Sequence, residues 1–505
     1  MSYTVVKYND LVSNDYSLLA NDYSYLEEYK TIENLKNKFD NIFTYFDSID
    51  GFAFPSKNYM PEYIPIYRKI PLIQIGNVNS EVCLSQNQNF EFLPVKEEQE
   101  KKKFLLSNKG VLISLTGGDD INNNISTFFD NDFKCFLNQR VSFFKLKNDN
   151  NMDLLYYFYA FTKHKIFNIQ WIGSGSIQKN TVSKERKKIF IPKISNETVI
   201  KYISVLTQAI INKDKLIKDR HKRIIETIEK ELQSNQKKDT FAYKLPKYQE
   251  VRESGRLDTN LYRKEFKEID FLIKNYSKGF NTIYDLGFAL SRGQNLQVSN
   301  IGNSIYSKTY YPNFYTLMLP KFLSKYGTID TVEYIGNQKE LKTLKKGDLI
   351  FGAEGFEKGR SIVIIEEKER TITNIHGITI QQEEHNVEKA IFVKCCLDYL
   401  RDKGLIDLFA VGGNGGSLAQ KYWEYIPFPK FAENEQLNLV KLYHNKETKY
   451  ESETWSLDNF LTNDNEFNNV AGIYELDKTA KQLKAKLNLA IDNIVNDKPV
   501  KINFA

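Results

Sequence analysis

The sequence has little cysteine and little histidine for its length. It contains 4 Cys and 5 His among 505 residues. No pair of cysteines has the CxxC spacing of a zinc or redox site, and no two histidines are four residues apart, as they are on a metal-binding helix. These residues are Cys83, Cys135, Cys395, Cys396, His164, His221, His376, His385 and His444. The scarcity argues against a disulfide framework and fits a reducing cytoplasm.

Long hydrophobic runs are also missing. No apolar stretch approaches the roughly 18 to 20 residues that a membrane helix needs. The first residues, MSYTVVKYNDL, lack the basic segment and apolar core of a signal peptide. We therefore expect a soluble cytoplasmic protein without a membrane partner.

The excess of positive charge is small. A net charge of +6 permits a polyanionic partner but does not require one. Hydrophobic residues make up 41% of the chain, with 34 Phe and 31 Tyr. This composition predicts a folded protein, and the length allows two or three domains.

No complete catalytic motif is present. Residues 302–309 resemble a phosphate-binding loop, G-x4-G-K-[ST], but Ser307 stands where its second glycine is required. Asp348, Glu366 and Lys368 could form a nuclease-like set that binds a divalent metal, although such triplets are frequent in a chain that is 27% charged. There is no G-x-S-x-G nucleophile elbow. We expect no catalytic residues, no metal site and no cofactor in this chain.

What the sequence does contain is an internal repeat. Four short segments in the first half have partners, in the same order, in the second half. The pairs are IQIGNV at 73–78 with LQVSNI at 296–301, KGVLIS at 109–114 with KGDLIF at 346–351, WIGSGSI at 171–177 with VGGNGGSL at 411–418, and FIPK at 190–193 with YIPF at 425–428. Four matches in one order predict a duplicated module.

Each copy is followed by a sequence with helical periodicity. After Pro192, Ser195 and Asn196 can cap a helix that we expect from about 196 to 236, roughly 60 Å long. Apolar residues recur there at Val199, Ile203, Leu206, Ile210, Ile217, Ile224 and Ile228. A second stripe contains Ile473, Leu476, Ala480, Leu483, Leu487, Ala490 or Ile491, and Ile494. Steps of three and four are typical of a coiled coil, although a helix packed on its own domain shows the same pattern.

These features predict an α+β fold, with two globular β-rich units separated and followed by long helices that pair as an antiparallel coiled coil. We expect the first unit at 1–194 and a spacer helix at 195–238. The second unit should follow at 239–431, and a second helical region at 432–505. The polar stretch at about 445–470 is predicted to be a loop insertion.

Basic residues occur in clusters that could contact DNA phosphates or base edges. For any single lysine, solvated surface is the better explanation. The candidates are Lys101, Lys102, Lys103, Arg140, Lys163, Lys179 and Arg186 in the first unit, and Arg292, Lys308, Lys346, Lys358 and Arg360 in the second.

In this arrangement the chain resembles the specificity subunit of type I restriction-modification systems. The segment from Gly175 to Lys193 is similar to the closing segment of that family, and Tyr425–Pro429 followed by Glu435 and Gln436 repeats it. Residues 256–262 resemble a start signature of the family. The resemblance covers roughly residues 60 to 500.

The resemblance implies a non-catalytic subunit with two target-recognition domains. Each domain would bind one half of a split double-stranded DNA target, and the paired helices would fix the spacer. Partners would be two methylase subunits, with S-adenosylmethionine for methylation of adenine N6, and restriction subunits that use ATP and Mg. Two other interpretations remain open: a specificity-like DNA-binding subunit of another phage-defence system, and a coiled-coil scaffold that binds protein.

Overall fold

The computed structural model describes residues 36–61, 63–79, 82–86, 89–117, 125–148, 150–171, 179–180, 189–193, 196–257, 260–355, 358–366, 370–412 and 416–504. The chain forms two compact units, each built from separate segments. The first unit comprises Met1–Lys215, Tyr450–Glu466 and Thr479–Ala505, and the second comprises Leu216–Lys449 and Phe467–Lys478. The predicted ranges treated the long helices as separate regions, whereas the two units share them.

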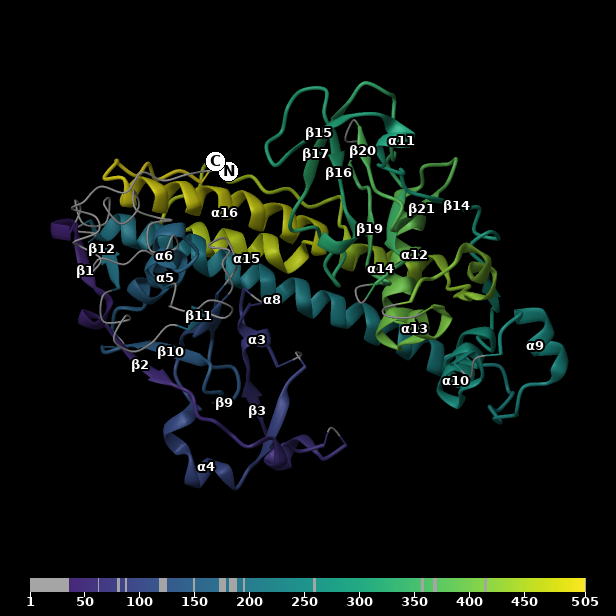
Figure 1. The fold of residues 1–505 in the computed structure, drawn as a ribbon, viewed down its shortest axis with the longest axis horizontal. Helices are drawn as coiled ribbons and strands as arrows, with labels where there is room; N and C mark the ends of the chain where they lie inside the picture. The colour runs from purple at the N-terminus through teal and green to yellow at the C-terminus, as the bar shows by residue number, and fades with distance from the viewer. Residues whose placement is uncertain are drawn as a thin grey trace. The chain divides into compact units, whose positions relative to one another are not determined.

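Both units combine sheets and helices, so the α+β class is confirmed (Figure 1). The first unit begins with β1 (Phe39–Asn41), β2 (Phe46–Asp50), β3 (Lys69–Ile73), α3 (Ile75–Asn79), β4 (Glu91–Pro94), α4 (Glu97–Glu100) and β5 (Leu105–Leu106). It continues with β6 (Gly110–Ser114), β7 (Thr116–Gly117), β8 (Ser126–Phe129), β9 (Cys135–Leu137), β10 (Val141–Leu146), α5 (Met152–Phe161), α6 (Lys165–Trp171), β11 (Lys179–Asn180) and β12 (Phe190–Pro192).

The second unit has a similar series of elements. It contains α9 (Tyr248–Ser254), α10 (Lys264–Lys274), β13 (Phe280–Asn281), β14 (Ala289–Arg292), α11 (Val298–Ile301), β15 (Ser304–Ser307), β16 (Tyr315–Leu317), β17 (Glu333–Asn337) and β18 (Leu349–Gly352). It continues with β19 (Ser361–Val363), β20 (Thr371–Ile372), β21 (Gly377–Gln381), α12 (Val387–Asp402), α13 (Leu405–Phe409), β22 (Phe428–Pro429) and α14 (Glu433–Tyr443). The helices α8 (Glu197–Ser234), α15 (Phe460–Val470) and α16 (Ile473–Val495) contribute residues to both units.

A four-stranded antiparallel sheet of the same topology forms the framework of each unit. Its strand order is β2-β10-β6-β8 in the first unit and β14-β21-β18-β19 in the second. The repeated KG segments enter the equivalent strands β6 and β18, each of which is flanked by two partners. The repeated segments at 73–78 and 296–301 also correspond, because each contains a short helix, α3 or α11.

A short antiparallel strand pair closes each framework. In the first unit Phe39 lies opposite Pro192, and in the second Phe280 lies opposite Pro429. The proline equivalent to Pro192 is therefore Pro429, and the sequence match with Pro427 was displaced by two residues. The paired strands had not been recognised as a repeat, because β1 and β13 are only two or three residues long.

The second sheets of the two units differ in connection. In the first unit the order is β4-β3-β9-β5, and in the second it is β15-β17-β16-β20. The strand parallel to β9 is β3, which precedes α3, whereas the strand parallel to β20 is β16, which follows α11. We call the sheets β4-β3-β9-β5 and β15-β17-β16-β20 the distal sheets of the two units. The two units thus have a common framework, and their distal sheets differ by the added strand β15 and by the place of the short helix.

Helices cover the framework sheets at equivalent places. Asn151 caps α5 and Asn386 caps α12, each by accepting a hydrogen bond from the backbone N–H three residues later, at 3.3 and 3.0 Å. In the first unit, buried residues of α5 and α6 share one core with β6, β10 and the start of α8. None of the described helices is apolar over enough residues to cross a bilayer.

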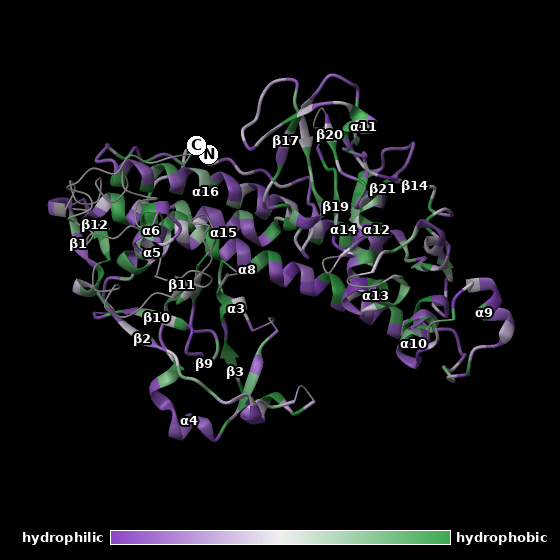
Figure 2. Ribbon diagram, in the orientation of Figure 1, coloured by the Kyte–Doolittle hydropathy of each residue, from purple (hydrophilic) through white to green (hydrophobic). Residues whose placement is uncertain are grey.

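The long helix predicted after the first closing strand is α8, with 38 residues. Asn196 accepts a hydrogen bond from the N–H of Thr198 at 3.0 Å, as expected at a helix start, while Ser195 lies outside the described residues. Hydrophobic and hydrophilic residues alternate along α8 and α16 in Figure 2. Both helices are therefore amphipathic, as predicted.

The prediction of a loop at about 445–470 is wrong for its last part, because residues 460–470 form helix α15. The segment looked like a loop because it is polar, but Asp464 and Asn468 are each only 1% exposed. In the first unit Asp464 forms an ion pair with Lys213 of α8 at 2.7 Å. Buried polar contacts between α8 and α15, together with the buried ring of Phe460, position this helix.

Candidate nucleic-acid interface

Three predicted lysines lie beside the distal sheet of the first unit. Lys102 and Lys103 begin a single 3-10 turn, Lys102–Phe104, and both are exposed. The Lys101 ammonium lies 4.6 Å from the centre of the Phe52 ring, which holds its side chain against the unit. These three lysines could contact phosphates.

An aromatic and basic surface beside the same sheet was not predicted from the sequence. Tyr63 and Tyr67 are 83% and 72% exposed, and the Arg68 guanidinium lies 5.5 Å from the ring centre of Tyr67. Exposed rings beside cations can contact nucleic acids through stacking and phosphate pairing. The signal was the pair Tyr67-Arg68, in which a basic residue follows an aromatic one directly, whereas Lys69 is buried against Phe92.

The distal sheet of the second unit has a comparable surface. Lys308 follows strand β15 and is exposed. Around it Ile305, Tyr306 and Tyr310 are 69%, 54% and 61% exposed. The ring of Tyr310 packs edge-on against Tyr334, with centres 5.5 Å apart. Because residues 304–307 form a strand, this segment is not the phosphate-binding loop considered from the sequence.

Arg292 lies in a charged cluster at one end of the framework sheet of the second unit. Its Nη1 is 3.0 Å from Glu354 Oε1, and Glu354 Oε2 is 2.7 Å from His376 Nδ1. Burial alone would raise the pKa of Glu354, but the His376 hydrogen bond and the Arg292 charge lower it overall. Glu354 and His376 had not been chosen as candidates, because they lie far from Arg292 in the sequence.

The structure removes three predicted contacts from the candidate interface. Lys163 donates to the carbonyl of Ser126, and burial lowers its pKa well below the usual value. Lys358 is 10% exposed and pairs with Asp407 at 2.6 Å. Arg360 donates to the carbonyl of Leu323 at 2.8 Å. Each of these cations is bound inside its own unit, which composition could not show.

The other predicted basic residues are not gathered on one surface. Arg140 is exposed in the turn between β9 and β10. Lys179 lies in β11, of which only the backbone is described, and Arg186 lies outside the described residues. Lys346 precedes β18 and therefore lies at the opposite end of that strand from Glu354.

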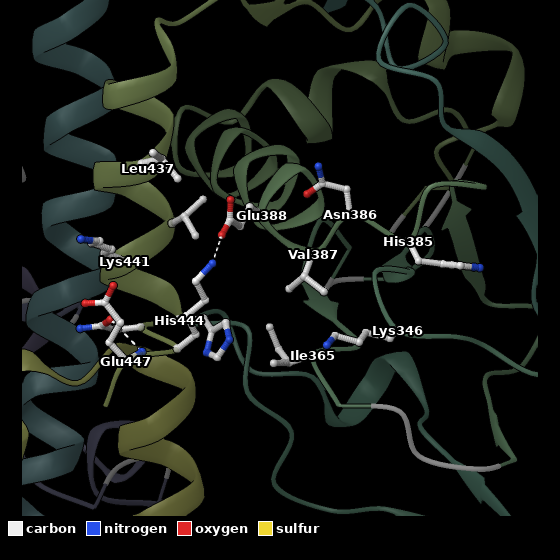
Figure 3. Close-up of a pocket in the computed structure, with 13 residues that line it drawn as sticks. Lys346, Ile365, His385, Asn386, Val387, Glu388, Leu437, Lys441, His444 and Glu447 are labelled. Atoms are coloured by element: carbon white, nitrogen blue, oxygen red, sulfur yellow. Dashed lines mark hydrogen bonds and ion pairs between the residues drawn. The ribbon is translucent and has the colours of Figure 1, made fainter. Parts of the chain in front are cut away.

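Lys346 lines an open pocket of about 560 Å³ in the second unit (Figure 3). The pocket also contains Glu388, which forms an ion pair with Lys446 at 2.9 Å, and its floor includes Ile365 and Val387. The pocket thus combines both signs of charge with apolar contacts.

The metal set considered from the sequence is not assembled in the structure. Asp348 is 1% exposed and accepts hydrogen bonds from the Lys345 N–H at 2.8 Å and from the Gln381 amide at 3.0 Å. Glu366 pairs with Lys478, and Lys368 lies outside the described residues. In the part of the chain that the structure describes, no His, Cys, Asp and Glu side chains are grouped to bind a metal ion.

Helix-pairing residues meet in the core of the first unit. Ile203, Leu206 and Ile210 of α8 share one hydrophobic cluster with Leu483 and Leu487 of α16. Ile494 is partly buried against the same cluster. This cluster also contains α5 and α6, so α8 packs on its own globular unit as well as on α16.

The second half of α8 packs against the second unit. Ile217, Ile224 and Leu476 are all buried there. Ile228 and Leu232 line a small cavity together with Tyr399 of α12. Arg220 donates to the carbonyls of Asn468 and Ala471 at 2.6 and 2.5 Å, so a cation caps the C-terminus of α15.

A buried histidine on α8 should make the second unit sensitive to acid. His221 lies 3.6 Å from Asp398 of α12, and burial, the largest effect, lowers its pKa from 6.5 to about 4. Between these values the unfolded chain binds more protons than the folded one, so stability falls as the pH decreases. Because of this histidine, we expect the free energy of unfolding to fall by about 2 kcal/mol between about pH 7 and about pH 5.

The replacement His221→Gln should remove this part of the acid sensitivity. Urea unfolding of both proteins at the two pH values measures the difference. An equal loss of stability in wild type and variant would contradict the assignment.

Comparison with known proteins gives matches only among solved structures. No family model matches the sequence, and no curated protein does either. The S subunit of a type I restriction-modification system from M. genitalium is 14% identical, with a TM-score of 0.38, over 90% of this chain and 94% of that one. The HsdS subunit from Thermoanaerobacter tengcongensis is 11% identical, with a TM-score of 0.25, over 90% and 97%. The type IIG restriction endonuclease BpuSI is 10% identical, with a TM-score of 0.30, over 40% and 30%.

Proposed function

We propose that this chain is the DNA sequence-specificity subunit of a type I restriction-modification complex. It would recognise a bipartite DNA target, recruit methylase and restriction subunits, and catalyse no reaction itself. One observation carries the proposal: each unit has the same four-stranded framework, closed by a Phe–Pro strand pair and followed by a helix. The sequence resemblance described above gives this duplicated module its function.

The differences between the units support recognition of two different half-sites. The framework is common, whereas the distal sheets differ in their connections, and that of the second unit has the additional edge strand β15. The exposed lysines and tyrosines described above lie on or beside these distal sheets. A common scaffold with different binding surfaces is suited to two DNA sequences recognised by one chain.

The helices support a spacer function. Residues 197–215 of α8 belong to the first unit and residues 216–234 to the second, and α16 is also shared. A continuous helix of 38 residues is about 57 Å long. We propose that α8, α15 and α16 together set the number of unspecified base pairs between the half-sites.

Catalytic chemistry would belong to the partners. Two methylase subunits would bring S-adenosylmethionine, and restriction subunits would bring ATP and Mg. A specificity-like subunit of another phage-defence system would bind DNA in the same way but would not support methylation. A coiled-coil scaffold would bind protein and would show no DNA affinity that depends on salt.

Binding of a duplex at several salt concentrations tests the DNA contact. We expect log K to fall linearly with log[salt], because lysines displace counterions from phosphates. Replacing Lys101, Lys102 and Lys103 with Ala should reduce the slope by about 0.9 for each phosphate that a lysine no longer neutralises. Fluorescence anisotropy measures this slope.

Lys201→Ala is the control, since Lys201 is also exposed but lies on α8, where it pairs with Asp458. Its salt slope should equal that of the wild type. A wild-type protein whose affinity is independent of salt would favour the scaffold.

A further inference from the structure

The two units contain the same turn at the same end of the framework sheet. In the first unit the Val141 N–H donates to the Asn138 carbonyl at 2.9 Å, and in the second the Gly377 N–H donates to the Asn374 carbonyl at 3.0 Å. The asparagine side chains accept from the backbone N–H two residues later, at Arg140 and His376, at 3.2 and 3.3 Å. Both turns therefore have the same backbone and the same internal hydrogen bonds.

A glycine fixes the approach of a second strand to each turn. A Cβ atom on Gly51 would lie 2.1 Å from the Asn138 carbonyl oxygen, and one on Gly293 would lie 2.2 Å from that of Asn374. The N–H groups of both glycines donate into the turn, to Val141 at 3.1 Å and to Gly377 at 3.0 Å. Only glycine fits at either position, so the scaffold has kept its constraint in both copies.

The third part of the scaffold is the end of the central strand. The Leu115 N–H donates to the Arg140 carbonyl at 2.9 Å, and the Ala353 N–H donates to the His376 carbonyl at 3.1 Å. The next residues, Thr116 and Glu354, are therefore equivalent. Each also pairs with a later segment of the chain: Thr116 with Asn180, and Glu354 with Ser417.

Three side chains next to the shared asparagine and glycine differ between the two units. Asp50, which precedes Gly51, corresponds to Arg292, which precedes Gly293. Thr116 corresponds to Glu354, and Arg140 corresponds to His376. The charge of the first position is reversed, and the other two change in charge and shape. Positions whose backbone is kept while their side chains change are suited to a common scaffold that binds two different sequences.

The chemistry of five of these residues suits base edges, whereas Thr116 is only 9% exposed. Arginine and histidine can donate to guanine, and carboxylates can accept from cytosine N4. Asp50 and Arg140 are exposed, and the His376 side chain is 59% exposed. The Arg292, Glu354 and His376 side chains also bind one another, so they are held in place before any DNA arrives.

We propose that these equivalent positions contact bases and determine the half-site of each unit. Asp50 and Arg140 would serve the first half, and Arg292, Glu354 and His376 the second. This inference rests on the proposed function. It adds the residues through which two copies of one scaffold recognise different sequences.

Competition binding with the complete methylase complex tests the proposal. The probe is a duplex that contains the two-part target found by methylation sequencing, together with duplexes in which each base pair is replaced in turn. We expect the wild type to discriminate roughly ten- to hundredfold at each recognised pair. Arg292→Ala or His376→Ala should remove this discrimination at one pair of one half, and Arg140→Ala at one pair of the other half.

The exchanges Arg140→His and His376→Arg serve as second variants, because each turn then carries a side chain that the same backbone holds in the other unit. Lys201→Ala should leave every ratio unchanged. Unchanged ratios in all turn variants, or a uniform weakening across all duplexes, would overturn the proposal while leaving the function intact. A wild type that binds every duplex equally would overturn both.

Discussion

Lys213→Ala should lower the free energy of unfolding of the first unit by about 3 to 5 kcal/mol. Lys213 of α8 and Asp464 of α15 lie 2.7 Å apart, with side chains 0% and 1% exposed. Asp464 also accepts a hydrogen bond from the Tyr450 hydroxyl at 2.9 Å. Without the lysine, a buried carboxylate loses its cation, which costs far more than losing an exposed pair. Urea unfolding of the full chain measures the change.

Two further variants separate burial from charge. Lys201→Ala breaks an ion pair with Asp458, whose side chain is 90% exposed, and should change stability by less than about 1 kcal/mol. The triple variant with Lys213→Met, Asp464→Leu and Tyr450→Phe replaces all three buried polar groups by apolar ones. It should recover most of the stability that Lys213→Ala loses. If Lys201→Ala were as costly as Lys213→Ala, burial of the pair could not be the reason.

The second large effect is expected for Leu206→Ala, at about 3 kcal/mol. Leu206 is 0% exposed and belongs to the cluster that contains Leu483 and Leu487 of α16. A double-mutant cycle with Leu483→Ala should give a coupling energy of about 0.5 to 3 kcal/mol, because residues that pack together are not independent. Additive losses would show that α8 and α16 are held by the globular unit rather than by each other.

Much of the fold could be predicted because the repeat and the helical stripes are local patterns. Residues at steps of three and four in 199–228 and 473–494 identified α8 and α16. The KG segments identified the equivalent strands β6 and β18. These patterns depend on the alternation of apolar residues, which the sequence displays directly.

Other parts could not be predicted, since they depend on contacts between distant residues. Helix α15 is held by buried polar groups such as Asp464, which in a sequence are indistinguishable from those of a loop. Lys358 and Arg360 looked like surface cations, but their partners Asp407 and Leu323 lie far along the chain. The correspondence of Pro192 with Pro429 became visible only through their pairing with β1 and β13.

The candidate interface was predicted least completely. Arg140 and Arg292 were among many basic residues, and composition gave no reason to prefer them. Their equivalence with His376 and Asp50 depends on hydrogen bonds of the two turns and on the close approach of Gly51 and Gly293. The positions that differ between the two units can be identified only after the backbone contacts show which residues are equivalent.

Methylation sequencing of genomic DNA tests the central claim most directly. A host that contains the complete set of subunits is compared with the same host lacking only this chain. We predict a two-part N6-methyladenine motif, separated by a fixed number of unspecified bases, in the first host and its complete loss in the second. The same set of methylated motifs in both hosts would contradict a specificity function for this chain.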